Sequence, residues 1–214
     1  MSREPILSNG TLGVINHGIG NIRSLTNALD YLDFQYRIIT QVHDAANLEA
    51  IILPGVGNFG AVMKAIEDSG LKEMLKDHLT AGEPFLGICV GMQVLLQGSS
   101  EASGVSGFGV FDGELHHLSS LDSSILVPSI GWKDLSPGPG NLEPPLSVKE
   151  AYFTHSYYAQ GLKEEEVMST YRWGNFDIPA HIAKGRVQGV QFHPEIGRQE
   201  GLNFLRNTLK VITR

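Results

Sequence analysis

The chain has 214 residues, an ordinary share of apolar and charged side chains, and a formal net charge of −7. This negative balance argues against non-specific binding to nucleic acid, whose phosphates attract clustered Lys and Arg. No stretch approaches the roughly 18 consecutive apolar residues of a membrane span, and the first residues lack the apolar core of a signal peptide. We therefore expect one globular domain over residues 1–214, with neither a membrane nor nucleic acid as its partner.

The cysteine count limits the chemistry further. One cysteine is present in the whole sequence, so an internal disulfide cannot form and a cysteine-rich metal site cannot be built. A cytoplasmic location fits a chain that needs no disulfide. We expect no metal and no cofactor.

The first half of the chain alternates short apolar runs of β type with longer segments of helical period. This alternation is typical of a parallel sheet with helices on both faces. Strands are expected at residues 12–15, 36–39, 50–53 and 85–88. Helices are expected at residues 22–32, 61–66, 71–79 and 92–96. The strand at 50–53 should stop at Pro54, and the helix that begins at Met92 should end near Gly98.

The second half carries glycines and alternating patterns that favour antiparallel strands. Such strands are expected at residues 109–116, 152–158, 167–171, 180–183 and 187–192, the last two pairing across a short turn. Residues 201–211 should form an amphipathic helix with Leu202, Leu205 and Leu209 on one side. The predicted fold class is α/β, a doubly wound and mostly parallel sheet with antiparallel additions in the second half.

The only cysteine lies in the sequence GICVG, where Gly87 and Gly91 flank Cys89 at equal distance. This form is typical of a nucleophile elbow, a sharp strand-to-helix turn that presents the side chain above the sheet. A β-carbon on either flank would crowd such a turn. The helix that follows should favour the thiolate over the thiol, whose ordinary pKa is about 8.5. The alternative is a buried cysteine that packs as a small apolar residue.

A thiolate nucleophile needs a base that later acts as an acid, and the sequence QFHPE offers one at a second strand end. We predict that His193 is this base and that Glu195 orients its imidazole. Strand ends at the carboxyl edge of a doubly wound sheet are where sites gather. Of the other histidines, His78 is expected to face solvent.

The third element is PGVG, which spans residues 54–57 at the end of a buried strand. Its backbone could direct N–H groups at a developing oxyanion, and the N–H of Val90 would be a second donor. The loop HGIGN could instead bind phosphate, but the remaining glycine of a dinucleotide motif is missing.

Six motifs follow one another along the chain: GNIRSL, PGVGNFG, GICVGMQVLL, VPSIGW, YFTHSYY and QFHPE. With them the chain resembles the class I glutamine amidotransferases, which carry a Cys-His-Glu triad on an α/β sheet. Within that family it resembles the glutaminase subunits of imidazole glycerol phosphate synthase. The resemblance implies that Cys89 attacks the side-chain amide of glutamine, that His193 protonates the departing ammonia, and that Glu195 completes the triad.

The resemblance also implies roles for further residues. Gly55, Val56 and Val90 would flank the oxyanion hole. The glutamine-binding residues would be Gly57, Gln93 and the backbone of His155, Ser156 and Tyr157. The ammonia would pass through a channel to a (β/α)₈ cyclase, bound as a heterodimer, that makes imidazole glycerol phosphate in histidine biosynthesis. Residues at or near the face toward that cyclase would be Asn21, Trp132 and Tyr152.

Five positions depart from the usual motifs of that family: Asn16, His17, Ser129, Ile196 and Gly197. Ile196 stands where the family has a lysine that docks the partner. The departures leave open a paralogous glutaminase that feeds a cyclase-like partner and a sugar amidotransferase in surface polysaccharide synthesis. A stand-alone γ-glutamyl cysteine hydrolase and an inactive scaffold subunit are two further alternatives.

Overall fold

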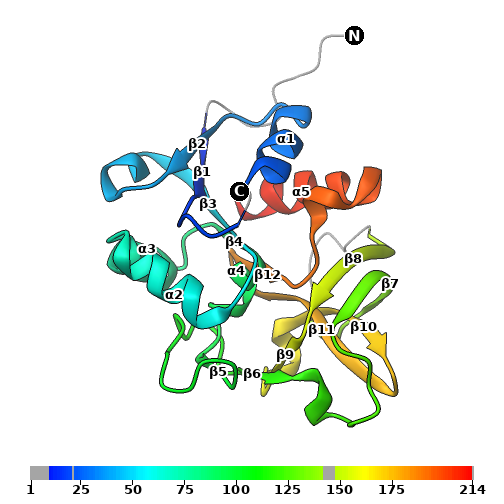
Figure 1. Ribbon diagram of the computed structural model, residues 1–214. Helices are drawn as coiled ribbons and strands as arrows, with labels where there is room; N and C mark the ends of the chain where they lie inside the picture. Colours follow the sequence, from blue (N-terminus) through cyan, green and yellow to red (C-terminus); the bar gives the residue numbers. More distant parts are fainter. Residues whose placement is uncertain (1–9, 21, 142–147, 214) are drawn as a thin grey trace.

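The computed structural model describes residues 10–20, 22–141 and 148–213 (Figure 1). The strands are β1 (Thr11–Ile15), β2 (Tyr36–Ile39), β3 (Leu48–Gly55), β4 (Phe85–Cys89), β5 (Gly98–Ser99), β6 (Glu114–His117), β7 (Ser129–Pro137), β8 (Glu150–His155), β9 (Tyr157–Gln160), β10 (Val167–Trp173), β11 (Phe176–Lys184) and β12 (Val187–Val190). The α-helices are α1 (Arg23–Tyr31), α2 (Phe59–Asp68), α3 (Lys72–Thr80), α4 (Val90–Gln93) and α5 (Arg198–Ile212). Short 3₁₀ helices are η1 (Val42–Ala45), η2 (Leu118–Ser120), η3 (Glu164–Glu166) and η4 (Pro194–Ile196).

A nine-stranded sheet forms the centre, in the order β2-β1-β3-β4-β12-β11-β10-β7-β8. The first five strands pair in parallel, and every pairing from β12 to β8 is antiparallel. Strands β5, β6 and β9 make a small second sheet. This architecture confirms the predicted fold class, including the antiparallel additions in the second half.

Helices cover both faces of the parallel strands. Figure 1 shows α1 and α5 on one side of β1, β3 and β4, and α2 and α3 on the other. The buried stripe of α1 includes Leu25 and Leu29, four residues apart, and Leu32 just beyond the helix is buried as well. In α5, Leu205 and Leu209 are buried and Leu202 is partly buried. The apolar face predicted for the C-terminal helix is therefore the face that α5 turns inward, and α1 buries its periodic leucines in the same way.

Strand β3 does not stop at Pro54, as the sequence suggested, but continues to Gly55. The N–H of Ile51 donates to the carbonyl of Pro84, so residues 51, 53 and 55 turn their N–H groups toward β4. The nitrogen of Pro54 faces β1 instead, and the pairing of β1 with β3 ends before it, at Ile52. The missing N–H of proline therefore costs this strand no ladder hydrogen bond.

The helix predicted at residues 92–96 is wrong in its bounds, because α4 begins at Val90 and ends at Gln93. The strand predicted at 109–116 is also too long, since only β6 forms there. One set of contacts explains both errors. The backbone N–H groups of residues 108–111 donate to the carbonyls of Val94, Leu95 and Leu96, so one segment cannot continue its helix and the other cannot pair as a strand.

The single strand predicted at 152–158 is two strands in different sheets. Strand β8 pairs with β7, whereas β9 pairs with β6. Between them, the carbonyl of Ser156 accepts a hydrogen bond from the N–H of Leu118. Strand β7 was not predicted, because its Gly131 and Pro137 resemble a loop composition. The break, with the ends of β8 and β9 on either side of it, forms one wall of the site described below.

Candidate active site

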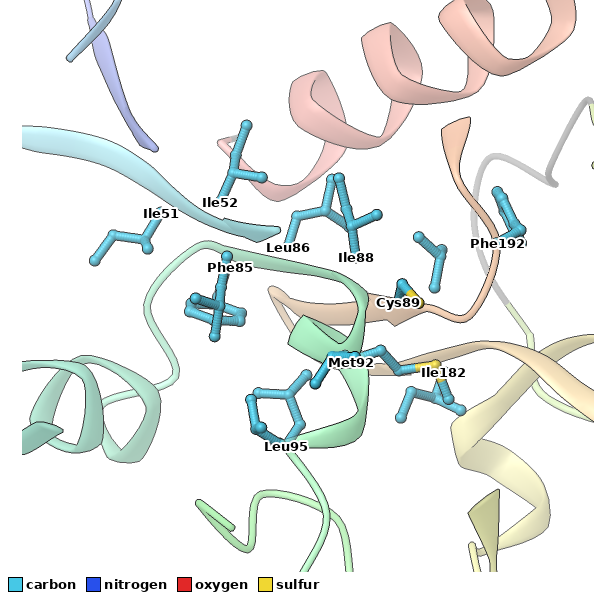
Figure 2. Close-up of a cluster of buried hydrophobic side chains, with 14 of the residues drawn as sticks. Ile51, Ile52, Phe85, Leu86, Ile88, Cys89, Met92, Leu95, Ile182 and Phe192 are labelled. Carbon is cyan, nitrogen blue, oxygen red and sulfur yellow. The ribbon is translucent and has the colours of Figure 1, made fainter. Parts of the chain in front are cut away.

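Cys89 ends β4 directly before α4, with φ 55° and ψ −111°. A non-glycine residue in this region is strained, as expected of a nucleophile elbow. The flanking glycines are required by space. A β-carbon on Gly87 would lie 2.4 Å from the carbonyl oxygen of Gly91, and one on Gly91 would lie 1.8 Å from that of Leu53. Figure 2 shows Cys89 where β4 meets α4, near Phe192 and Met92.

His193 reaches the nucleophile because β12, which precedes it, is the neighbour of β4 in the sheet. Its Nδ1 lies 2.8 Å from Oε1 of Glu195, and both side chains are largely buried. The other ring nitrogen, Nε2, is buried without a hydrogen bond to any residue that the structure describes. Burial lowers the pKa of His193, but interactions with Cys89 and Glu195 outweigh it and raise the pKa to about 10.

A cavity of about 320 Å³ opens at the nucleophile. It collects residues from both halves of the chain, including most of the predicted site. Its lining consists of Val56, Gly57, Cys89, Val90, Gln93, Glu101, Pro128, Thr154, His155, Ser156, Tyr157 and His193. Glu195 and Gly55 lie outside it, along a second and much smaller cavity behind His193. The arrangement leaves room for a small polar substrate directly above the sulfur.

The side chain of His155 holds the wall together. Burial lowers its pKa to about 4, so the ring is neutral at pH 7. The phenol of Tyr171, whose pKa is raised by burial, donates to Nε2 at 2.8 Å. Nδ1–H then donates to the carbonyl of Tyr157, also at 2.8 Å. Both ring nitrogens of His155 are thus already paired, which leaves its backbone groups for a ligand; glutamine binding by that backbone stays a prediction.

The PGVG segment lies beside the elbow, since Gly55 pairs with Cys89 in the register of β3 and β4. The loop before α1 packs against it: the Nε2–H of His17 donates to the carbonyl of Pro54 at 3.1 Å. A β-carbon on Gly20 would lie 2.5 Å from Cγ2 of Val56. The donation of hydrogen bonds to an oxyanion by the N–H groups of Gly55, Val56 or Val90 stays a prediction.

Two of the residues predicted at a partner face lie together. The rings of Trp132 in β7 and Tyr152 in β8 meet edge to face at 5.7 Å, and the guanidinium of Arg198 covers Trp132 at 4.7 Å. Both aromatic side chains are half-buried. Ile130, 53% exposed, is two residues from Trp132 on the same face of β7. The third residue, Asn21, lies outside the described residues.

Sequence reasoning missed several residues. Glu101 lines the cavity with a carboxylate that accepts the N–H of Phe59 at 2.8 Å, and nothing in the run SSEASG marks it. Pro128 and Thr154 were also missed. Gln191 was overlooked although it stands two residues before His193. His78 does not simply face solvent, because its half-buried ring donates from Nε2 to the carbonyl of Pro84 at 3.0 Å.

Among residues 10–20, 22–141 and 148–213, no cluster of three or more His, Cys, Asp and Glu side chains is arranged to hold a metal ion. Over the same residues, no helix has the length and apolar character needed to cross a membrane.

Comparisons with known proteins agree with this geometry. Residues 13–212 match the family model "Glutamine amidotransferase class-I". The chain is 35% identical to the "Imidazole glycerol phosphate synthase subunit HisH" of Caldanaerobacter subterraneus subsp. tengcongensis, covering 94% of this chain and 98% of that protein. The subunit of the same name from Bacillus subtilis is also 35% identical, covering 94% and 96%.

Solved structures show the same fold. One described as a crystal structure of glutamine amidotransferase has a TM-score of 0.70 at 20% identity, covering 94% of this chain and 99% of its own. PurLQS from Thermotoga maritima has a TM-score of 0.67 at 19% identity, covering 94% and 97%.

Proposed function

We propose that this chain, which belongs to the class-I glutamine amidotransferase family, hydrolyses glutamine at Cys89 and passes the ammonia to a cyclase subunit. Its relatives are HisH subunits of imidazole glycerol phosphate synthase, and with them it is a glutaminase of histidine biosynthesis. The observation that carries the assignment of residues is the cavity in which the strained Cys89 meets His193, itself hydrogen-bonded to Glu195.

The first half of the reaction follows from this geometry. The thiolate of Cys89 attacks the side-chain carboxamide carbon of glutamine, and the carbonyl oxygen becomes an oxyanion. Backbone N–H groups of Val90 and of the PGVG segment are the candidate donors to that oxyanion. His193 gives the proton on Nε2 to the departing nitrogen, so ammonia leaves and a γ-glutamyl thioester remains. Glu195 keeps the Nδ1–H of the ring in place throughout.

The second half restores the enzyme. His193, now neutral at Nε2, takes a proton from water as the water oxygen attacks the thioester carbon. The carbon–sulfur bond breaks, glutamate leaves, and Cys89 returns to the thiolate. Thiolate, imidazole and carboxylate, together with the attacking water, supply every proton and electron pair that the two steps need, and we propose no cofactor for this chemistry.

We assign the amino-acid end of glutamine to residues of the cavity lining other than the nucleophile and its base. Gly57, Gln93 and the backbone of His155, Ser156 and Tyr157 are available there. Glu101 adds a carboxylate to the same lining, and it is suited to the α-ammonium group of the substrate. The cavity would thus bind the amino-acid end of glutamine by charge and place the side-chain carboxamide at the sulfur of Cys89.

The partner we propose is a (β/α)₈ cyclase that forms a heterodimer with this chain, and the location we propose is the cytoplasm. The apolar surface of Trp132 and Ile130 supports such a contact. Ile196, 49% exposed and next to Glu195, gives the neighbouring surface an apolar rather than a charged character. We propose that contacts with this surface determine whether the chain binds a histidine-pathway cyclase or a different synthase.

The test is glutamate release from glutamine by the chain alone, with the histidine-pathway cyclase of the same cell, and with that cyclase plus its formimino ribonucleotide substrate. We expect strong stimulation by the complete mixture and none in Cys89→Ala. If the cyclase does not stimulate glutamate release while Cys89 is still reactive, the proposed cyclase partner would be wrong and the sugar-amidating alternative would be favoured. High activity of the chain alone would favour a stand-alone hydrolase, and an unreactive Cys89 would favour a scaffold.

A further inference from the structure

Two buried amide side chains lead from the cavity to the nucleophile. Nε2 of Gln93 donates to Oε1 of Gln191 at 3.0 Å, and Nε2 of Gln191 donates to Sγ of Cys89 at 3.7 Å. The three residues come from α4, from the segment after β12, and from the end of β4. Gln191 is far from the other two residues in the sequence, and only the folded structure brings its side chain into contact with theirs.

The direction of the two hydrogen bonds follows from the groups at each end. A glutamine amide has one acceptor oxygen and one donor nitrogen. Because the oxygen of Gln191 is occupied by Gln93, the nitrogen of Gln191 faces the sulfur. An N–H that points at sulfur favours the negatively charged thiolate, which is the reactive form of cysteine.

Gln191 holds this position without help from a ligand. Its backbone N–H donates to the carbonyl of Ala180 in β11 at 2.9 Å, so the sheet fixes its Cα. Its side chain is 1% exposed and is not part of the cavity lining. Gln191 therefore reaches the reacting sulfur from behind, where no substrate would touch it.

We propose that the side-chain amide of Gln191 stabilises the Cys89 thiolate by donating to Sγ, and that Gln93 holds that amide in the required orientation. The contact thereby links a cavity residue to the nucleophile through one intermediate side chain. The role in glutamine hydrolysis rests on the proposed function, whereas the effect on thiol reactivity does not.

Other titratable groups also face the thiol, and a test has to leave them unchanged. His193 interacts with the thiol, and Glu195 is hydrogen-bonded to its ring from η4. Across the cavity lie His155, Tyr157 and Glu101, from the β8–β9 wall and the loop after β5. A substitution at Gln191 alters none of these side chains, so a changed response of Cys89 to pH can be assigned to the lost N–H donor.

The test is the rate of alkylation of Cys89 by iodoacetamide, followed by intact mass in the absence of glutamine. Because the sequence has one cysteine, the single adduct reports on this thiol alone. We expect Gln191→Met, which keeps the length and loses the donor, to react about tenfold more slowly at pH 7. The pH of half-maximal alkylation should rise by about one unit.

The matched control is Gln188→Met in β12, three residues before Gln191. Gln188 is also 1% exposed, but its amide oxygen accepts from Nε2 of His181 and does not approach the sulfur. We expect this control to be alkylated at the wild-type rate. Equal slowing in both variants would overturn the proposal, because it would mean that any buried methionine in β12 or just after it loosens the site.

A second variant keeps the test valid should Gln191→Met fold poorly. Gln191→Glu has nearly the same shape, lacks the N–H donor and adds negative charge, so alkylation should be slower still. Wild-type rates and pH response in folded Gln191→Met or Gln191→Glu would refute the role of the amide. If alkylation slows as expected while the wild type releases no glutamate with any partner, the proposed function fails and the thiolate contact stands.

Discussion

The two sides of the cavity are held in different ways. On the side of Cys89, the backbone of β3, β4 and β12 sets the geometry, and the flanking glycines are there because no side chain fits. On the side of His155, the β8–β9 wall depends on side-chain hydrogen bonds to Tyr157 and Tyr171. The nucleophile side should therefore be sensitive to added volume, and the wall to lost hydrogen bonds and to acid.

The largest effect is expected at the nucleophile itself. Cys89→Ala removes the sulfur without adding volume, so the fold should be kept and glutamate release should fall by at least about 10³-fold. Steady-state kinetics together with thermal unfolding would show this. A variant that retained a tenth of the wild-type rate would rule out Cys89 as the nucleophile.

Added volume next to the elbow should cost both stability and activity. In Gly91→Ala, the new methyl group would meet the carbonyl oxygen of Leu53, and the backbone would have to shift. We expect a loss of about 3 kcal/mol in the free energy of unfolding and of most activity. Gly98→Ala is the control, since a β-carbon there meets nothing closer than 3.8 Å. Equal denaturation midpoints for the two variants would contradict the steric account.

Stability should fall on acidification because of the second half of the chain. Burial lowers the pKa values of His155 in β8 and His181 in β11 to about 4. Below pH 6.5 the unfolded chain binds protons that these folded residues do not, so each should remove up to about 1.4 kcal/mol per pH unit until about pH 4. Urea unfolding between pH 7 and 4.5 measures this slope. His181→Leu should flatten it, and an unchanged slope would exclude His181 as a cause.

His193, by contrast, should make the free energy of unfolding depend on pH in the alkaline range. The pKa of His193 is raised to about 10, so its charged form stabilises the fold fully below pH 6.5 and loses that contribution as the pH rises from 6.5 to 10. In His193→Gln the alkaline decline in stability should be shallower while the acid decline stays as in the wild type. A steeper alkaline decline in that variant would contradict the assignment.

Loss of one hydrogen bond in the wall should mainly weaken substrate binding. Tyr171→Phe removes the hydroxyl that donates to Nε2 of His155 and leaves that nitrogen unpaired. We expect a cost of about 1–2 kcal/mol in stability and a severalfold rise in KM, with a smaller change in kcat. An equal fall in kcat at unchanged KM would instead place His155 in the chemical step.

The smallest expected effect compares two histidines that make the same contact. His17 and His78 each donate from Nε2 to a proline carbonyl, at Pro54 beside the elbow and at Pro84 at the far end of β4. His17→Phe should lower kcat a few-fold because the PGVG segment loses an anchor, and His17→Gln, which keeps a donor, should recover much of it. His78→Phe should affect stability alone. Equal kcat values for the two phenylalanine variants would show that neither contact serves catalysis.

The same contrast explains what the sequence could predict. The elbow could be predicted from Gly87, Cys89 and Gly91 because its steric constraint is local. The base and the carboxylate that orients it could be predicted from QFHPE because they lie within three residues of each other. Strands β1, β2 and β4 were predicted to within one residue at each end. In β1 and β4 the reason is a nearly continuous buried run, whereas β3 extends two residues beyond its predicted bounds at each end.

The rest depends on contacts that no local pattern records. The division of residues 152–158 into β8 and β9 depends on Leu118, which takes the carbonyl of Ser156. Glu101 enters the cavity because its loop folds back onto the start of α2. Gln191 could have been noticed beside His193, but its contacts lie about a hundred residues away in sequence.

The central claim is that Cys89 forms a covalent bond with the side-chain carbonyl carbon of glutamine in this cavity. The most direct measurement is intact and peptide mass after incubation with a diazoketone analogue of glutamine, with the cyclase partner present. The account predicts one adduct, located at Cys89, that excess glutamine suppresses and that Cys89→Ala does not form. Labelling at another residue, or labelling at Cys89 that glutamine does not slow, would contradict it.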